Sequence, residues 1–148
     1  WLWVTPEPAR WPRGIPRRIQ ARGDLGQRMT AALRTLPAGP AIIVGTDIPD
    51  LDVGHVARAF AALKRHHAVF GPAEDGGYWL VGLRHRSRLP HLFDDVRWSS
   101  EFALADTLAN LGSANSHVLV DRLPDVDDAA ALARWKDSGS QLPMRVLS

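Results

Sequence analysis

Acidic side chains follow three apolar stretches of this sequence, at the points where strands are expected to end. They are Asp47 after residues 41–45, Glu74 and Asp75 after residues 67–70, and Asp125 and Asp127 after residues 117–120. Because the carboxyl ends of parallel strands meet at one edge of a sheet, we expect these side chains to converge. Converging carboxylates repel one another unless a cation joins them, and Mg²⁺ bound by one or two carboxylates and by phosphate oxygens is the usual solution. The pattern predicts a site for a divalent cation and a phosphate-bearing ligand.

Asp47 is the first candidate residue of this site. Residues 41–44 are continuously apolar and lie between Gly39-Pro40 and Gly45. This pattern is typical of a strand buried on both faces, since a half-exposed strand would alternate apolar with polar residues. Ligands of open α/β sheets bind in the crevice beyond such strand ends. The alternative interpretation of Asp47 is a helix cap or a turn residue.

The second candidate region is the segment that follows Asp75. Gly76 and Gly77 remove side chains where a backbone would approach a ligand closely, and Tyr78 and Trp79 can stack on a base or a sugar. The alternative is structural, with the glycines in a tight turn and the aromatic residues in the core. The short acidic, glycine-rich connection can also join residues 67–70 and 78–83 as a hairpin.

Residues 98–100 have the same two interpretations. Ser99 and Ser100, after Trp98, suit the start of a helix, and that start also offers free backbone amides to an anion. His66 and His67 are not a metal site, because adjacent side chains point apart on a strand or a helix. The glycines of the chain match neither the dinucleotide fingerprint nor the phosphate loop that ends in Gly-Lys-Ser/Thr.

The elements that must position these residues follow from hydrophobic periodicity. Strands are expected at residues 1–5, 41–45, 67–70, 78–83 and 117–120, and helices are expected to begin at Asp24, at Asp50 or Asp52, at Ser99 or Ser100, and near Ala129. The apolar faces of the first three helices are Leu25, Met29, Leu33 and Leu36; Val53, Val56, Ala57, Phe60 and Ala61; and Phe102, Ala105, Leu108 and Leu111. Residues 6–23, rich in Pro and Gly, are expected to be an irregular loop that folds over the crevice as a lid. This order of elements predicts a three-layer α/β fold with a mostly parallel sheet.

Composition limits the function classes. A chain of 148 residues, 45% of them hydrophobic, is expected to form one domain over residues 1–148. The absence of cysteine excludes disulfides and thiolate metal sites. No apolar run approaches the roughly 20 residues that span a bilayer, so a soluble cytoplasmic protein without a membrane partner is the default expectation. The net charge of +2 comes from arginines without interleaved aromatic residues, and nucleic-acid binding is therefore not expected.

Five segments, in this order, resemble one protein family. They are GDLGQRM (23–29), GTDIP (45–49), GPAEDGGYWLVGL (71–83), VRWSS (96–100) and LPDVD (123–127). The sequence is similar to the bacterial glycosyltransferase-A-fold proteins known as radical-SAM/selenodomain-associated transferases. These are in turn similar to the molybdenum-cofactor nucleotidyltransferases and to phospholactate guanylyltransferase. The resemblance covers nearly the whole chain from residue 23, and Glu-Asp-Gly-Gly-Tyr is its most specific part.

The resemblance implies a nucleotide-diphospho-sugar transferase fold that binds a nucleoside triphosphate or a nucleotide sugar with Mg²⁺ or Mn²⁺. Asp47 and Asp127 match metal ligands, and Asp75 is the candidate to orient the acceptor or to take its proton. The substrate-binding candidates are Gly45, Thr46, Glu74, Gly76, Gly77, Tyr78, Trp98 and Ser99. The role of Asp24 stays unassigned, since a helix cap accounts for it.

One departure from the family pattern leaves two alternatives open. Family members begin with a strand and a basic loop of the type Lys-x-Pro-x-Pro-Gly-x-Val-Lys-Thr-Arg-Leu, which is expected to hold the nucleotide phosphates; this sequence contains no such segment. Either it is a fragment of a metal-dependent nucleotidyl- or glycosyltransferase that acts on a small-molecule acceptor, or catalysis has been lost. The alternative function is a non-catalytic binding or assembly module that forms a homo-oligomer over its exposed sheet edge.

Overall fold

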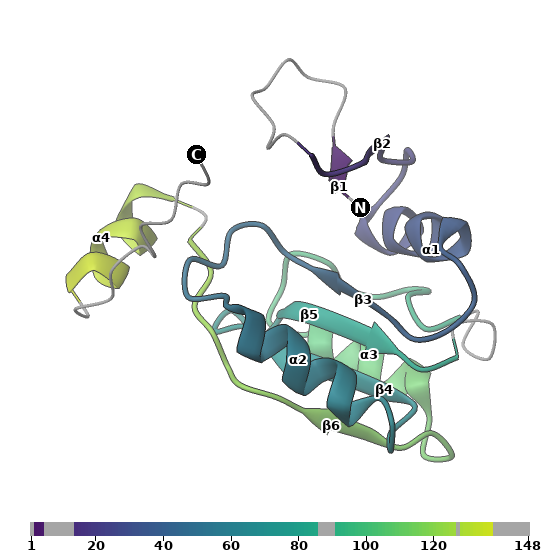
Figure 1. The fold of residues 1–148 in the computed structure, drawn as a ribbon. Helices are drawn as coiled ribbons and strands as arrows, with labels where there is room; N and C mark the ends of the chain where they lie inside the picture. Colours follow the sequence, from purple (N-terminus) through teal and green to yellow (C-terminus); the bar gives the residue numbers. More distant parts are fainter. Residues whose placement is uncertain (1, 5–13, 86–90, 127, 138–148) are drawn as a thin grey trace.

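The computed structural model describes residues 2–4, 14–85, 91–126 and 128–137 and has a mixed α/β fold (Figure 1). Its elements in chain order are β1 (Leu2–Val4), β2 (Arg17–Ile19), α1 (Leu25–Thr35), β3 (Ala41–Val44), α2 (Val53–Ala62), β4 (Ala68–Pro72), β5 (Tyr78–Leu83), α3 (Ala103–Leu111), β6 (His117–Leu119) and α4 (Ala129–Asp137). None of the helices in the described part of the chain has the length and apolar character needed to cross a bilayer.

The main sheet has four strands in the order β3-β5-β4-β6. β4 and β5 form the expected hairpin, and β5 is also antiparallel to β3, whereas β4 and β6 are parallel. Three of the four strands, β3, β4 and β6, therefore run in one direction, and only β5 opposes them. The carboxyl ends of those three strands lie at the same edge, and the hairpin turn at residues 73–77 is brought to that edge as well.

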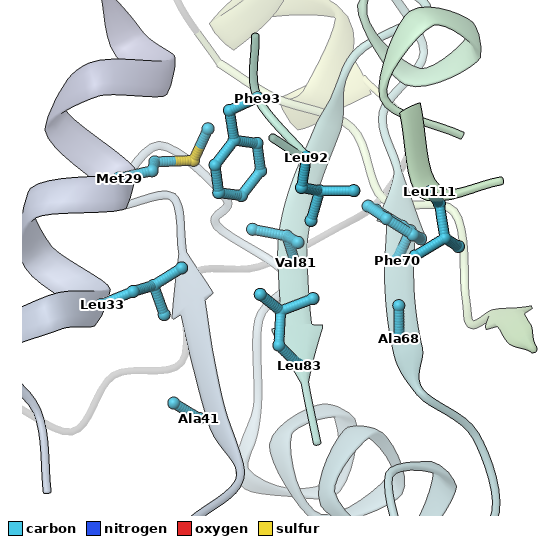
Figure 2. Packing of buried hydrophobic residues seen from close by; sticks show 10 residues of the cluster. All are labelled: Met29, Leu33, Ala41, Ala68, Phe70, Val81, Leu83, Leu92, Phe93 and Leu111. Atoms are coloured by element: carbon cyan, nitrogen blue, oxygen red, sulfur yellow. The ribbon is translucent and has the colours of Figure 1, made fainter. Parts of the chain in front are cut away.

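Helices cover both faces of this sheet (Figure 1). On one face, Met29 and Leu33 of α1 and Leu111 of α3 pack in a cluster that includes Phe70 of β4 (Figure 2). On the other face, a second cluster contains residues of α2, of the sheet and of the segments that follow them, namely Ile48, Ala59, Leu63, Val69, Trp79, Leu80 and Leu123. Phe70 and Val69 point to opposite faces because side chains alternate along a strand. The α/β fold with three layers is confirmed.

A β-bulge interrupts the β4–β5 pairing near the carboxyl end of β4. Gly71 pairs with Leu80 and Pro72 pairs with Tyr78, so Trp79 is an extra residue on β5. Because the bulge breaks the alternation, Trp79 and Leu80 both lie in the cluster on the α2 face. A side chain at Gly71 could not be accommodated, since its Cβ would lie 2.4 Å from the indole of Trp79.

Residues 17–19 correct one expectation from the sequence. They form β2, which pairs in parallel with β1, whereas the sequence predicted an irregular segment over residues 6–23. The pairing continues at both ends, with Leu2 N donating to Pro16 O at 2.9 Å and Gln20 N donating to Val4 O at 2.9 Å. This strand is short and polar and follows several prolines, so it has no recognisable periodicity. Residues 5–13 lie outside the described residues, and the lid stays a prediction there.

The expected helix starts at Asp24 and Asp52 are confirmed as capping boxes. Asp24 Oδ1 accepts from Gln27 N at 2.8 Å, and Asp24 N donates to Gln27 Oε1 at 3.1 Å. Asp50 has a different role, since its Oδ1 accepts from Trp135 Nε1 at 2.9 Å, which connects α4 to the segment after β3.

The apolar face predicted for α2 is wrong. Val53 is 84% exposed and Phe60 is 39% exposed, whereas Ala59 and Leu63 are buried. The helix packs on the sheet through Ala59, which is fully buried, and through Leu63, the residue that caps its C-terminus, whose Cδ1 would lie 3.2 Å from a Cβ at Gly82 of β5. The larger apolar residues of α2 are displaced to the outside, and hydrophobicity alone does not reveal which face fits such a close approach.

Replacing Gly82 with alanine tests the close packing around this residue of β5, where side chains of the two neighbouring strands and Leu63 meet. The added Cβ would lie 2.6 Å from Val69 Cγ1 and 2.8 Å from Ile42 Cγ2. Overpacking of this kind typically costs about 1–3 kcal/mol, so we expect Gly82→Ala to lower the Tm in thermal unfolding by several degrees. Gly54→Ala is the control, because there the new Cβ meets only side-chain ends and the helix propensity improves. A Gly82→Ala protein as stable as Gly54→Ala would contradict this account of the packing.

Candidate functional site

A cavity of about 640 Å³ opens at the carboxyl edge of the sheet. Its walls come from β1 and α1, from β3 and the segment that follows it, from the 73–77 turn and the first half of β5, and from residues 98–100. The predicted site residues that line it are Gly45, Thr46, Asp47, Asp75, Gly77, Tyr78, Trp98 and Ser99. Glu74 and Gly76 are not among the described residues that line it. Asp127 lies outside the described residues, and its assignment as a metal ligand stays a prediction.

Three carboxylates from separate parts of the chain meet at this cavity. Asp47 follows β3, Asp75 lies in the β4–β5 turn, and Asp125 follows β6. The backbone connects two of these segments directly, because Val126 N donates to Asp47 O at 2.9 Å. The topology thus brings together the acidic strand ends that the sequence places far apart.

The charge of this cluster changes the acidity of Asp125. Burial raises the pKa of Asp125 above its usual value, and the negative charges of Asp75, Asp47 and Glu74 raise the pKa further. Desolvation and repulsion both disfavour the charged carboxylate. A cation bound among these groups would relieve the repulsion. Within the described part of the chain, however, no three carboxylate or histidine side chains are arranged as a ready-made metal site.

The 73–77 turn is held rigidly against α3. Gly77 N donates to Asp75 Oδ1 at 2.8 Å, and Leu104 N donates to Gly76 O at 3.1 Å. Gly76 has a φ of +88°, and a Cβ there would lie 2.3 Å from Glu101 O. The turn interpretation therefore accounts for Gly76, whereas Gly77 faces the cavity beside Asp75.

The two aromatic candidates of β5 have different environments. Tyr78 and Trp98 both line the cavity, with their rings edge to face at 6.3 Å. The Tyr78 hydroxyl lies 3.3 Å from Thr107 Oγ1, and burial raises the pKa of Tyr78 well above its usual value. Trp79 is only 3% exposed, and its Nε1 donates to Asp121 O at 3.0 Å. Trp79 is also among the residues that line the cavity, but its burial and its place in the cluster on the α2 face favour the core interpretation.

An ion pair positions residues 98–100 at the rim of the cavity. Arg97 Nε and Nη2 donate to the two oxygens of Asp106 at 2.9 and 2.8 Å, and Arg97 N also donates to Asp106 Oδ2 at 3.0 Å. These hydrogen bonds to Arg97 hold the pKa of Asp106 at about 2. The segment is thereby attached to α3.

The predicted role of the serines as helix caps is wrong. α3 begins at Ala103, and no side chain caps its first turn. Ser100 Oγ instead donates to Arg97 O at 2.6 Å and accepts from Phe102 N at 3.2 Å. Ser99 has a φ of +55°, a left-handed conformation that is uncommon for a residue with a side chain. The serines thus form the turn that leads into α3.

Sequence reasoning missed Arg28, Gln20 and Trp3, which also line the cavity. Arg28 is the only lysine or arginine among the described lining residues. Its position one helical turn after the Asp24 cap would have identified it if the sequence had shown that α1 borders the crevice.

Comparison with known proteins then places the chain in a family. A model for the bacterial family described as "Uncharacterized protein conserved in bacteria (DUF2064)" matches residues 3–100, which is more than half of the sequence. The chain belongs to the DUF2064 family. No curated protein matches it.

A solved structure extends the comparison of this DUF2064 chain to its fold. The crystal structure of a putative nucleotide-diphospho-sugar transferase from Desulfovibrio desulfuricans G20 has 29% sequence identity to it and a TM-score of 0.78. The similarity covers 88% of the DUF2064 chain but 58% of that protein, so the chain spans less than two thirds of the matched length. The nucleotide-diphospho-sugar transferase fold expected from the sequence is thus supported by a structure outside this chain.

The Arg97–Asp106 pair predicts a pH-dependent stability. Because the pKa of Asp106 is lowered to about 2, the stability from its charged form is fully present above the usual Asp value near 4 and is lost as the pH falls toward 2. We expect Asp106→Asn to lower the Tm at pH 7, and the difference from the wild type to shrink below pH 4. Arg97→Gln should have a similar effect, and the double variant should lose little more. Additive losses in the double variant would contradict a direct interaction.

The raised pKa of Asp125 predicts that its charged form lowers the stability of the folded chain, whereas the charged form of Asp106 raises it. Because its pKa is raised, charging Asp125 destabilises the folded chain, and this cost develops as the pH rises through its folded pKa. We expect Asp125→Asn to raise the Tm at pH 7 without added cation by about 1–3 °C, which is typical of relieving exposed charge repulsion. The gain should disappear at acidic pH, where both proteins carry a neutral side chain. A lower Tm at pH 7 would show that Asp125 has a stabilising partner instead.

Proposed function

We propose that this chain forms the nucleotide-binding part of a metal-dependent transferase, which acts on a nucleoside triphosphate or a nucleotide sugar. The observation that carries the proposal is the convergence of Asp47, Asp75 and Asp125 on one cavity beyond the strand ends. The similarity to a putative nucleotide-diphospho-sugar transferase supports the same class. We further propose, from its five sequence segments, that it belongs with the radical-SAM/selenodomain-associated transferases.

Asp47 would hold Mg²⁺ or Mn²⁺ together with Asp127. The chemistry of the donors fits such an ion, because hard divalent cations prefer carboxylate oxygens and three carboxylates line this cavity. When bound, the ion would stabilise the charge that develops on phosphate oxygens during transfer.

The chain's own residues would bind and orient the reactants. Gly45 and Gly77 lack side chains at the cavity wall and leave room for a ligand, while the rings of Tyr78 and Trp98 offer apolar edges to a base or a sugar. Asp75 is the candidate to orient a small-molecule acceptor or to accept its proton, because its carboxylate is exposed and is fixed by Gly77 N. Transfer at phosphorus and transfer at a sugar carbon are both compatible with this arrangement.

One observation favours a second candidate, a non-catalytic assembly module. Within the described residues β3 pairs only with β5, and Ile42, Ile43 and Val44 at this edge are half-buried. An unpaired apolar strand edge is commonly covered by another chain. A homo-oligomer that covers β3 without binding nucleotides would support this second function.

Thermal shift with Mg²⁺ and a panel of nucleoside triphosphates and nucleotide sugars separates these functions. For a ligand at about one hundred times its Kd, mass action raises the stability by about 2.7 kcal/mol, or about 5–10 °C in Tm. We expect this shift only when both cation and nucleotide are present, and we expect Asp47→Asn to abolish it. Asp94→Asn, an exposed carboxylate that does not line the cavity, should retain it. If no nucleotide stabilises the wild type, the transferase proposal fails.

A further inference from the structure

A single cationic side chain lines a cavity whose other charged residues are all carboxylates within the described part of the chain. Arg28 of α1 lines it together with Asp47, Asp75 and Asp125, and no other lysine or arginine among the described residues does so. Arg28 is exposed, and it forms no ion pair with any carboxylate in the described ranges. A guanidinium that lines the same cavity as these carboxylates but is not paired with one is available to an anionic ligand.

The turn before α1 fixes this guanidinium at one edge. Arg28 Nε donates to Gly23 O at 2.8 Å, which leaves the two terminal nitrogens of the planar group for other acceptors. Gly23 has a φ of +112°, a conformation that a residue with a side chain rarely adopts. The capping box between Asp24 and Gln27 closes the same turn from the other side.

Gly26 places the helix that carries Arg28 at the cavity wall. A Cβ at this position would lie 2.7 Å from Phe93 O and 2.9 Å from the indole of Trp98. Any larger residue would therefore separate α1 from the segment that contributes Trp98 to the cavity. The sequence segment 23–29, whose role the family resemblance leaves unassigned, thus consists of residues that together hold Arg28 beside the acidic strand ends.

We propose that Arg28 binds a phosphate group of the substrate, with the turn at residues 23–27 as its support. This inference rests on the proposed function and specifies which residue of the described chain neutralises the phosphates. Guanidinium groups suit this task, because their planar N–H donors match two phosphate oxygens at once. Lysine cannot reproduce that geometry, although it keeps the charge.

Binding of inorganic pyrophosphate, measured by calorimetry with and without Mg²⁺, tests Arg28 separately from nucleotide recognition. Losing a charge-assisted pair of hydrogen bonds should weaken binding by about 10-fold or more in Arg28→Gln. Arg28→Lys should have an intermediate effect, because it retains the charge. Arg34→Gln is the matched control, since Arg34 is exposed on the same helix but does not line the cavity. Affinity should also fall as salt is raised for the wild type, and less steeply for Arg28→Gln.

Equal pyrophosphate affinities for Arg28→Gln, Arg34→Gln and the wild type would overturn the proposal, as would a wild type that does not bind pyrophosphate. The two proposals fail in different ways. If Mg²⁺-dependent nucleotide binding requires Asp47 but not Arg28, the transferase function stands and the role of Arg28 is wrong. If pyrophosphate binding requires Arg28 but nucleotides bind no more tightly than pyrophosphate, the anion site stands and the nucleotide function is wrong.

Discussion

Pairing of β5 with strands on both of its sides is the interaction on which the rest of this structure depends. β5 is hydrogen-bonded to β3 and to β4, and residues 79–83 are buried. Because β5 runs against its neighbours, the turn that enters it lies at the same edge as the ends of β3 and β6. The bulge at Trp79 then directs the indole into the core, while Tyr78 remains at the cavity. A register shift by one residue would exchange these two aromatic side chains between core and cavity.

The second organising feature is an imbalance of charge. Three carboxylates and one guanidinium line the cavity within the described part of the chain, and burial first, then repulsion among the acids, raises the pKa of Asp125. Ionising Asp125 therefore lowers the stability of the folded chain. The proposed ligand, which carries both a cation and phosphate groups, would relieve this repulsion.

Much of this architecture could be predicted from the sequence because it depends on local signals. The apolar runs at residues 41–45 and 117–120, the turn before Tyr78, and the caps at Asp24 and Asp52 each have a local physical cause, and the structure contains them. The convergence of Asp47 with Asp75 and Asp125 could also be expected, since it follows from strand direction alone.

The features that could not be predicted depend on contacts between distant elements. The buried face of α2 depends on how the helix packs on the sheet around Ala59 and Leu63, and the burial of Trp79 depends on a bulge that leaves no periodic signal. Arg28 belongs to the cavity only because Gly26 permits close packing against residues 93–98. The strand at residues 17–19 requires β1 as its partner and is too short and too polar to be recognised alone.

The contact between the 73–77 turn and α3 has a consequence for motion. Gly76 lies against the backbone of Glu101, and its carbonyl accepts from Leu104 N, so Asp75 cannot be displaced without moving the start of the helix. Opening of the cavity on this side would therefore move the hairpin turn and the start of α3 together as one body.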